Sequence, residues 1–207
     1  NAIATGGTVT KNPDKTLYSH GESVVLTVVP AVGKSFNAWS GDLSGSTNPV
    51  TLVMNANKSV SAACSAKICT LTATSANGTV TKSPNQASYT YGTTVTLTAA
   101  ANTGYSFGSW SGDAAGTANP VTITMDNDKA VTANFTQNTY TLTTTANNGT
   151  ITKSPSKTNY TYGETVTLTA TANTGYSFGS WSGDASGSTN PVTITINGNK
   201  AVTANFT

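Results

Sequence analysis

The sequence predicts an all-β protein of three tandem, β-rich repeat domains, each of about 70 residues, arranged as an elongated array. The first observation is a gap-free internal repeat: Trp39, Trp110 and Trp181 lie 71 residues apart (110 − 39 and 181 − 110). The second is composition, because abundant threonine favours strands, and asparagine and glycine favour turns. The third is hydrophobic period: polar and apolar residues alternate in many segments, and no window shows a helical period of about 3.6 residues.

The offset places the repeats at 1–65, 66–136 and 137–207. The second and third are nearly identical, whereas the first is more diverged and its opening strand is truncated, keeping only Asn1 to Thr5. The short segments between repeats predict an array in which each domain contacts its neighbours.

Within one repeat, the expected elements can be followed in the third copy. An Asn-Gly pair between alternating segments predicts a tight hairpin whose two central residues both have positive φ. The short turns favour mostly antiparallel pairing of about six strands. The expected strands and their connecting turn are, in order, 140–146, the turn at Asn148-Gly149, 150–155, 160–172, 175–181, 192–196 and 201–206.

A Phe-x-x-Trp segment gives each repeat its large aromatic residues. Phe107 and Trp110 would face opposite sides of a regular strand, because their separation is odd. Position 108 is glycine, and its equivalents are Gly179 and Asn37, the residue types that best tolerate positive φ. We therefore expect a bulge that turns both aromatic rings into the core. The predicted core aromatics, besides the tryptophans, are Phe36, Phe107, Phe178, Phe135 and Tyr140.

An alternative interpretation of the same segment is a displayed ligand site. In that case the tryptophan rings would stack on sugars, and the aspartate of each following Ser-Gly-Asp would accept hydroxyl hydrogen bonds. Tyr105 and Tyr176 are replaced by Lys34 in the first repeat, so this position is expected to be exposed. The candidate ligand-contact residues are Tyr105, Tyr176, Trp39, Trp110, Trp181, Asp42, Asp113 and Asp184.

Two cysteines flank the first junction. Cys64 and Cys69 occupy the positions of Phe135 and Tyr140 at the second junction. Replacement of both aromatics together suggests that the two positions touch, as an aromatic contact in one place and a disulfide in the other. A turn between them would allow the required Cα separation of roughly 4.4–6.8 Å. Two free thiols remain the alternative.

Composition argues against several classes of function. Charged residues make up 9% of the chain, arginine is absent, and the lysines are dispersed, which argues against a nucleic-acid surface. No apolar run reaches a membrane-spanning length of roughly 20 residues. No catalytic constellation, metal-ligand cluster or cofactor motif is present, and the single histidine, His20, replaces a tyrosine of the other repeats. We expect no enzyme activity and no cofactor.

Several strings resemble the divergent internalin-type B-repeat family of bacterial surface and secreted proteins. They are Y-G-x-x-V-x-L, G-Y-x-F-x-x-W-x-G-D and V-x-A-N-F, and the resemblance covers essentially the whole chain three times. The first repeat departs from it at His20, Lys34 and Ala63-Cys64. The resemblance implies small β-grasp-related domains, extracellular or at the cell surface, without catalytic activity. It implies roles as stalks, adhesive modules, or accessories to polysaccharide-acting domains.

These observations give two functional expectations. The first is a non-catalytic extracellular array that acts as a stalk, adhesive or filament-forming module, whose partners are the neighbouring repeats and other copies of the chain. Such copies would pair with the strand edge left open by the truncated opening strand, unless trimming of a fragment explains that gap. The second is a carbohydrate-binding accessory module, in which three weak sites gain avidity for a polysaccharide.

Overall fold

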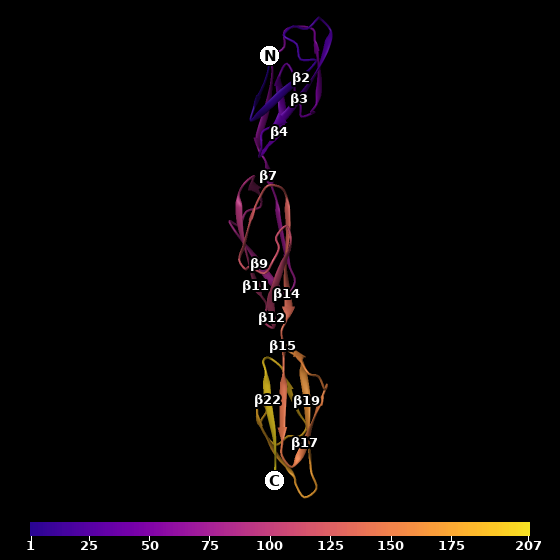
Figure 1. Ribbon diagram of the computed structural model, residues 1–207, viewed down its shortest axis with the longest axis vertical. Coiled ribbons are helices and arrows are strands. Elements are labelled where there is room, and N and C mark those ends of the chain that lie inside the picture. Colours follow the sequence, from indigo (N-terminus) through magenta and orange to yellow (C-terminus); the bar gives the residue numbers. More distant parts are fainter.

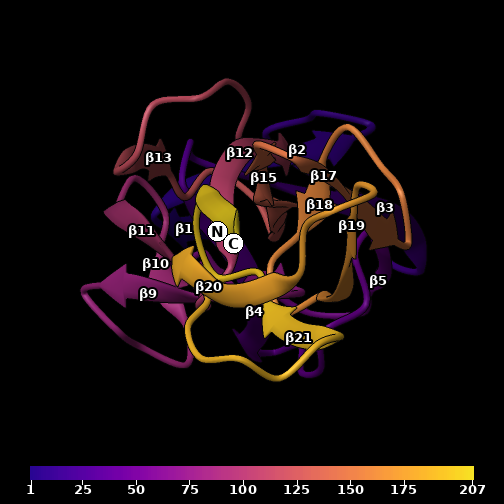
Figure 2. The same ribbon diagram turned by 90° about the horizontal axis from the view of Figure 1, so that it is seen from below.

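The computed structural model describes residues 1–207. The chain forms only strands and turns, folded into three domains that follow one another end to end along one long axis (Figure 1). Seen along that axis, the domains overlap, with both ends of the chain near the centre (Figure 2). The prediction of three tandem all-β domains in an elongated array is therefore confirmed. None of its segments forms a helix that could cross a membrane.

Repeats 2 and 3 each contain two three-stranded sheets and a two-stranded ladder. In repeat 2 one sheet has the order β12-β14-β8 and the other β13-β11-β9, while β7 pairs with β10. The strands of repeat 2 are β7 (Ile68–Cys69), β8 (Leu71–Ser75), β9 (Gly78–Ser83), β10 (Tyr89–Thr90), β11 (Thr94–Ala101), β12 (Tyr105–Gly112), β13 (Val121–Thr124) and β14 (Lys129–Gln137).

The other repeats have the same order of strands. Those of repeat 3 are β15 (Thr139–Tyr140), β16 (Leu142–Ala146), β17 (Gly149–Ser154), β18 (Tyr160–Thr161), β19 (Thr165–Ala172), β20 (Phe178–Gly183), β21 (Val192–Thr195) and β22 (Lys200–Phe206). Repeat 1 has no two-stranded ladder, and its strands are β1 (Ala2–Thr5), β2 (Gly7–Asn12), β3 (Glu22–Pro30), β4 (Lys34–Gly41), β5 (Val50–Met54) and β6 (Val60–Ala66).

The predicted Asn-Gly hairpin is wrong. In repeat 2 the opening strand β8 pairs in parallel with the closing strand β14, whereas β9 joins the other sheet by pairing with β11. The turn at Asn77-Gly78 therefore carries the chain from one sheet to the other. Only Asn77 has a positive φ, at 64°. Gly78 is needed for a different reason, since a Cβ there would collide with the ring of Phe135.

Each repeat encloses its own core between its two sheets. Buried apolar side chains alternate with exposed or half-buried threonines along β11 and β19, which is the pattern of strands with one solvated face. The core clusters contain 12 buried residues in repeat 2 and 11 in repeat 3, but only 6 in repeat 1. Repeat 1 therefore has the smallest buried core of the three.

The strand that carries the Phe-x-x-Trp segment has the expected bulge. Its pairing with β14 shifts register between Phe107 and Ser109, and β4 and β20 shift at the equivalent positions. As a result Phe107 and Trp110 face the same core, with ring centroids 5.2 Å apart. The expected positive φ is absent at Gly108. A Cβ there would lie 3.3 Å from the carbonyl oxygen of Asn134, a tight approach that the small residue avoids.

Candidate functional site

The three tryptophans lie inside the repeats and not on their surface. Each is 3% exposed, so no indole face is available for stacking on a sugar. The indole N–H groups also have partners, as buried Trp requires. They donate to the backbone carbonyls of Thr47, Ala118 and Thr189 at 2.9–3.0 Å.

The aspartates that follow the tryptophans hold the backbone in place. One oxygen of each carboxylate accepts a backbone N–H at 2.7 Å, and the donors are Ser59, Ala130 and Ala201 for Asp42, Asp113 and Asp184. The Ala201 N–H, together with Lys200, lowers the pKa of Asp184. This bond ties the loop after the tryptophan to the start of the closing strand.

Tyr105 and Tyr176 are the candidate ligand residues that keep exposed surface. Tyr105 is half-buried at the start of β12, opposite Gln137 of β14. Tyr176 is 45% exposed, and the next residue, Ser177, is hydrogen-bonded to Thr207. Of the predicted sugar-contact residues, Tyr176 therefore offers the most accessible ring.

The expected disulfide is absent, and both Cys64 and Cys69 are free cysteines. The sequence interpretation assumed a turn between them, but β6 continues almost directly into β7. Five residues of extended chain span roughly 16 Å, far beyond the Cα separation that a disulfide allows. Cys64 packs against the core of repeat 1, and the thiol of Cys69 lies 3.9 Å from the Met125 carbonyl oxygen within repeat 2.

The aromatics at the second junction are separated in the same way. Phe135 packs against Phe107 inside repeat 2, with ring centroids 5.9 Å apart. Tyr140 instead faces Tyr162 inside repeat 3, at 6.4 Å. The two positions therefore do not touch each other at either junction, and each completes the core of its own repeat.

A single residue connects neighbouring repeats, and its backbone bonds to both of them. The N–H of Lys67 donates to the Gly33 carbonyl of repeat 1 at 2.8 Å, and its carbonyl accepts the Tyr91 N–H of repeat 2 at 2.9 Å. Asn138 makes the same two bonds, to Gly104 at 2.8 Å and from Tyr162 at 3.2 Å. The connecting residue is thus hydrogen-bonded to both repeats, and no flexible linker separates them.

A tyrosine of the following repeat covers a glycine of the preceding one at each junction. Tyr91 lies against Gly33, and Tyr162 lies against Gly104. Both glycines have positive φ, +73° and +84°, and a Cβ at Gly104 would lie 2.5 Å from the Tyr162 ring. The sequence interpretation missed this contact, although the signal is present: glycine recurs at 33, 104 and 175, and tyrosine at 91 and 162.

The comparison with known families agrees with this architecture. The divergent InlB B-repeat domain family matches residues 2–67, 69–139 and 140–207. The chain belongs to this family. No curated protein matches it. The matched B-repeats begin and end within a few residues of the limits expected from the 71-residue offset, and together they cover nearly the whole chain.

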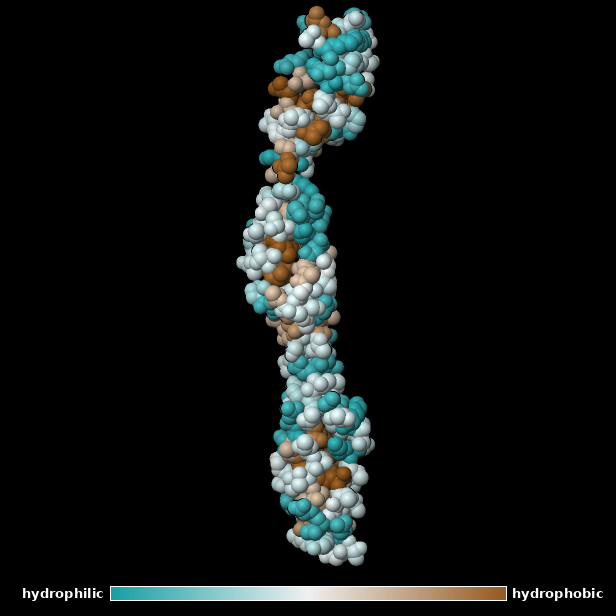
Figure 3. Space-filling view, viewed as in Figure 1, coloured by the Kyte–Doolittle hydropathy of each residue, from teal (hydrophilic) through white to brown (hydrophobic).

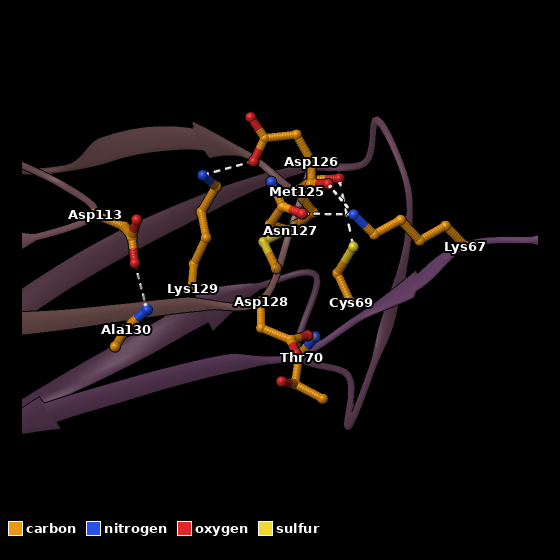
Figure 4. Close-up of polar contacts among 10 residues, drawn as sticks. All are labelled: Lys67, Cys69, Thr70, Asp113, Met125, Asp126, Asn127, Asp128, Lys129 and Ala130. Carbon is orange, nitrogen blue, oxygen red and sulfur yellow. Dashed lines mark hydrogen bonds and ion pairs between the residues drawn. The ribbon is translucent and has the colours of Figure 1, made fainter. Parts of the chain in front are cut away.

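No group of three or more potential metal-ligating side chains occurs in these B-repeats. A network of polar contacts lies at the first junction (Figure 4). The Lys67 ammonium donates to the Asp126 carbonyl at 2.9 Å and to Oδ1 of Asn127 at 2.5 Å. The carboxylate of Asp128 accepts the Thr70 N–H at 2.7 Å. This network fixes the turn before β14 against the strand that enters the repeat.

The second junction uses neutral groups for the same purpose. Asn199 occupies the position of Asp128, and its Oδ1 accepts the Thr141 N–H at 3.0 Å. The side chain of Asn138 accepts the hydroxyl of Ser106 at 2.7 Å, and so reaches back into repeat 2. The two junctions therefore share their backbone bonds and differ in charge.

Acidification is expected to weaken the first junction and to leave the second unchanged. The Thr70 N–H lowers the pKa of Asp128 below its ordinary value of 3.8. A carboxyl whose folded pKa is lowered stabilises the fold above its unfolded pKa and loses that contribution as pH falls through the folded pKa. Below pH 3.8 the hydrogen-exchange protection of Thr70, corrected for intrinsic rates, should fall relative to that of Thr141.

The control is Asp128→Asn, which copies Asn199 and should remove the pH dependence at Thr70. Equal changes in protection of Thr70 and Thr141 on acidification, in both proteins, would show that this carboxylate does not control the junction.

Proposed function

We propose that the chain is a non-catalytic extracellular stalk, an array of B-repeats that holds whatever it joins at a fixed separation. The observation that carries this proposal is the junction, where one residue is hydrogen-bonded to both neighbours and a tyrosine ring covers a glycine. Short linkers with contacts on both sides suit a spacer, whereas domains on long flexible linkers move independently.

The surface supports the same proposal. Hydrophobic residues appear in separate patches between hydrophilic and neutral ones on the face shown in Figure 3, without one continuous apolar face. The chain also has a formal net charge of only +2 and few charged residues, which gives little electrostatic attraction for a polyanion. Membership of the B-repeat family is consistent with a location outside the cell.

Small-angle X-ray scattering of the whole chain tests the stalk. The expected result is a rod-like distance distribution that does not change with protein concentration. A variant with Gly-Ser-Gly inserted after Asn138 is the matched control, because it introduces a flexible linker at one junction and leaves the repeats intact. This variant should show the broad distribution of flexibly linked domains. A wild-type curve equal to that of the variant would contradict a stiff stalk.

Carbohydrate binding is a second candidate, favoured by the exposed ring of Tyr176. Sugars stack on aromatic faces, and an exposed tyrosine presents such a face with a polar hydroxyl at its end. Affinity gels containing soluble polysaccharides test this function. Retardation of the wild type that is lost in Tyr176→Ala would support it. Absence of retardation across a broad panel would leave the stalk as the function.

A further inference from the structure

We propose that each repeat resists tension along the chain, so that the array is a force-resistant tether as well as a spacer. The proposal rests on the direction of two strands. In repeat 2 the opening strand β8 and the closing strand β14 lie side by side and run parallel. The chain enters this repeat at one end of the long axis and leaves it at the other (Figure 1). The inference builds on the proposed stalk, but it concerns the strength of each repeat and not the stiffness of the junctions.

The parallel arrangement determines how tension acts on the hydrogen bonds. Pulling on the two ends of repeat 2 draws β8 and β14 along their own lengths in opposite directions. The bonds of a parallel ladder cross from strand to strand at even spacing, so this tension loads all of them together, in shear. If both pulled ends lay at the same end of the pair, the bonds would open one after another. Shear therefore requires the larger force.

The opening strand is bonded along its whole length. Five residue pairs of β8 and β14 are in register, beginning with Leu71 and Lys129. One residue earlier, the Thr70 carbonyl accepts the Lys129 N–H at 2.9 Å, and the Thr70 N–H donates to the Asp128 carboxylate at 2.7 Å. Before that, β7 is paired with β10. The entering chain is therefore held to the repeat from β7 to the end of β8.

The closing strand is held more firmly than the opening one. β14 is the central strand of its sheet and has seven further register pairs with β12 on its other side, whereas β8 is an edge strand paired only with β14. The pair of β8 and β14 is therefore the place where tension first separates the repeat. The side chains of Leu71, Val131 and Ala133 are buried beneath this pair. They keep water, which competes for hydrogen bonds, away from its inner face.

The same parallel pair recurs in the other repeats. In repeat 3, β16 and β22 have five register pairs, and the Thr141 carbonyl accepts the Lys200 N–H at 2.9 Å. In repeat 1, β1 and β6 have four register pairs. The three repeats follow one another along a single chain, so each of them experiences the whole tension (Figure 1). A tether of this kind needs the shear arrangement in every repeat, and every repeat has it.

Single-molecule pulling of the whole chain tests the proposal when one attachment point is moved. Gly198 lies in the turn before β22, next to the opening strand, because the side chain of Asn199 accepts the Thr141 N–H. A Cβ at Gly198 would meet no atom within 4 Å, so Gly198→Cys introduces a thiol for attachment without a collision. All samples carry Cys64→Ala to remove the half-buried native thiol, and Cys69 is 0% exposed. Pulling between an N-terminal tag and the new thiol opens β16 from β22 one bond at a time.

The matched control is the same protein pulled through tags at both ends, with its thiol blocked. Moving the attachment from the C-terminal tag to residue 198 should lower the unfolding force of repeat 3 at least about twofold at equal pulling speed, because its ladder bonds then break in sequence. The forces of repeats 1 and 2 should not change. Repeat 3 is recognised because its unfolding then releases nine residues fewer (207 − 198). An unchanged force for repeat 3 would overturn the proposal.

Two matched substitutions separate mechanical strength from ordinary stability. Val202 in β22 and Val166 in β19 are 1% and 0% exposed, and only β22 belongs to the loaded pair. Val202→Ala and Val166→Ala should lower the urea midpoint of repeat 3 by similar amounts. Forced unfolding reports the unfolding rate, and at constant force Val202→Ala should raise that rate several-fold more than Val166→Ala. Equal acceleration by both would contradict resistance located between β16 and β22. Neither result alters the scattering test of the stalk, which reports on the junctions.

Discussion

Trp110→Ala is expected to destabilise repeat 2 strongly while the stabilities of repeats 1 and 3 are unchanged. Trp110 is 3% exposed, its ring lies 5.2 Å from that of Phe107, and its N–H is bonded to Ala118. Truncating a buried tryptophan to alanine costs about 3–5 kcal/mol. A domain of this length has a free energy of unfolding of only about 4–10 kcal/mol. The substitution should therefore remove much or all of the stability of that repeat.

Urea denaturation followed by residue-resolved NMR measures this effect, because each repeat reports separately. Trp181→Ala is the matched substitution and should act in the same way on repeat 3. Tyr176→Ala, at an exposed aromatic of that repeat, should change its stability by no more than about 0.5 kcal/mol. A loss below about 1 kcal/mol for Trp110→Ala would mean that the ring is not a structural part of the core.

The burial of Phe107 and Trp110 could be predicted because local features determine it. Their odd spacing conflicts with the two-residue period of a strand, and the glycine or asparagine between them allows the extra residue that resolves the conflict. The repeat itself supplied the test, since all three copies keep the phenylalanine and the tryptophan and vary at the tyrosine or lysine position two residues before the phenylalanine. The fold class and the inward faces of the strands followed from the same period.

The partners of the strands could not be predicted in this way. Asn77-Gly78 has the composition of a hairpin turn, but the parallel pairing of β8 with β14 depends on contacts about 58 residues apart. The disulfide expectation failed for a related reason. Sequence separation does not tell whether five residues turn back or run straight, and here the chain runs straight from one repeat to the next.

The contact of Tyr162 with Gly104 depends on how two separate domains are placed, which no periodicity within one repeat reveals. The sequence nevertheless contains a hint. The last of the three equivalent glycines, Gly175, has the same φ of +84°, and a Cβ added there would have no atom within 4 Å. This difference between equivalent glycines makes a controlled experiment possible.

Gly104→Ala is expected to loosen the junction between repeats 2 and 3, whereas Gly175→Ala is not. Both alanines would adopt a positive φ, which costs roughly 1–2 kcal/mol of backbone strain. Only at position 104 would the added Cβ also meet the Tyr162 ring, at 2.5 Å. The Tyr162 ring must then move away from residue 104. NMR relaxation should report one common rotational diffusion tensor for both repeats in Gly175→Ala, and separate, faster tumbling of repeat 3 in Gly104→Ala.

A double-mutant cycle with Tyr162→Ala separates the collision from the strain. If the ring on the glycine stiffens the junction, Tyr162→Ala alone should loosen it, and adding Gly104→Ala should then loosen it little further. The strain would still lower the stability of repeat 2 in the double variant. If both single substitutions leave the two repeats tumbling together, the backbone bonds of Asn138 hold the junction without help from the tyrosine, and the stiffness of the stalk resides in that one residue.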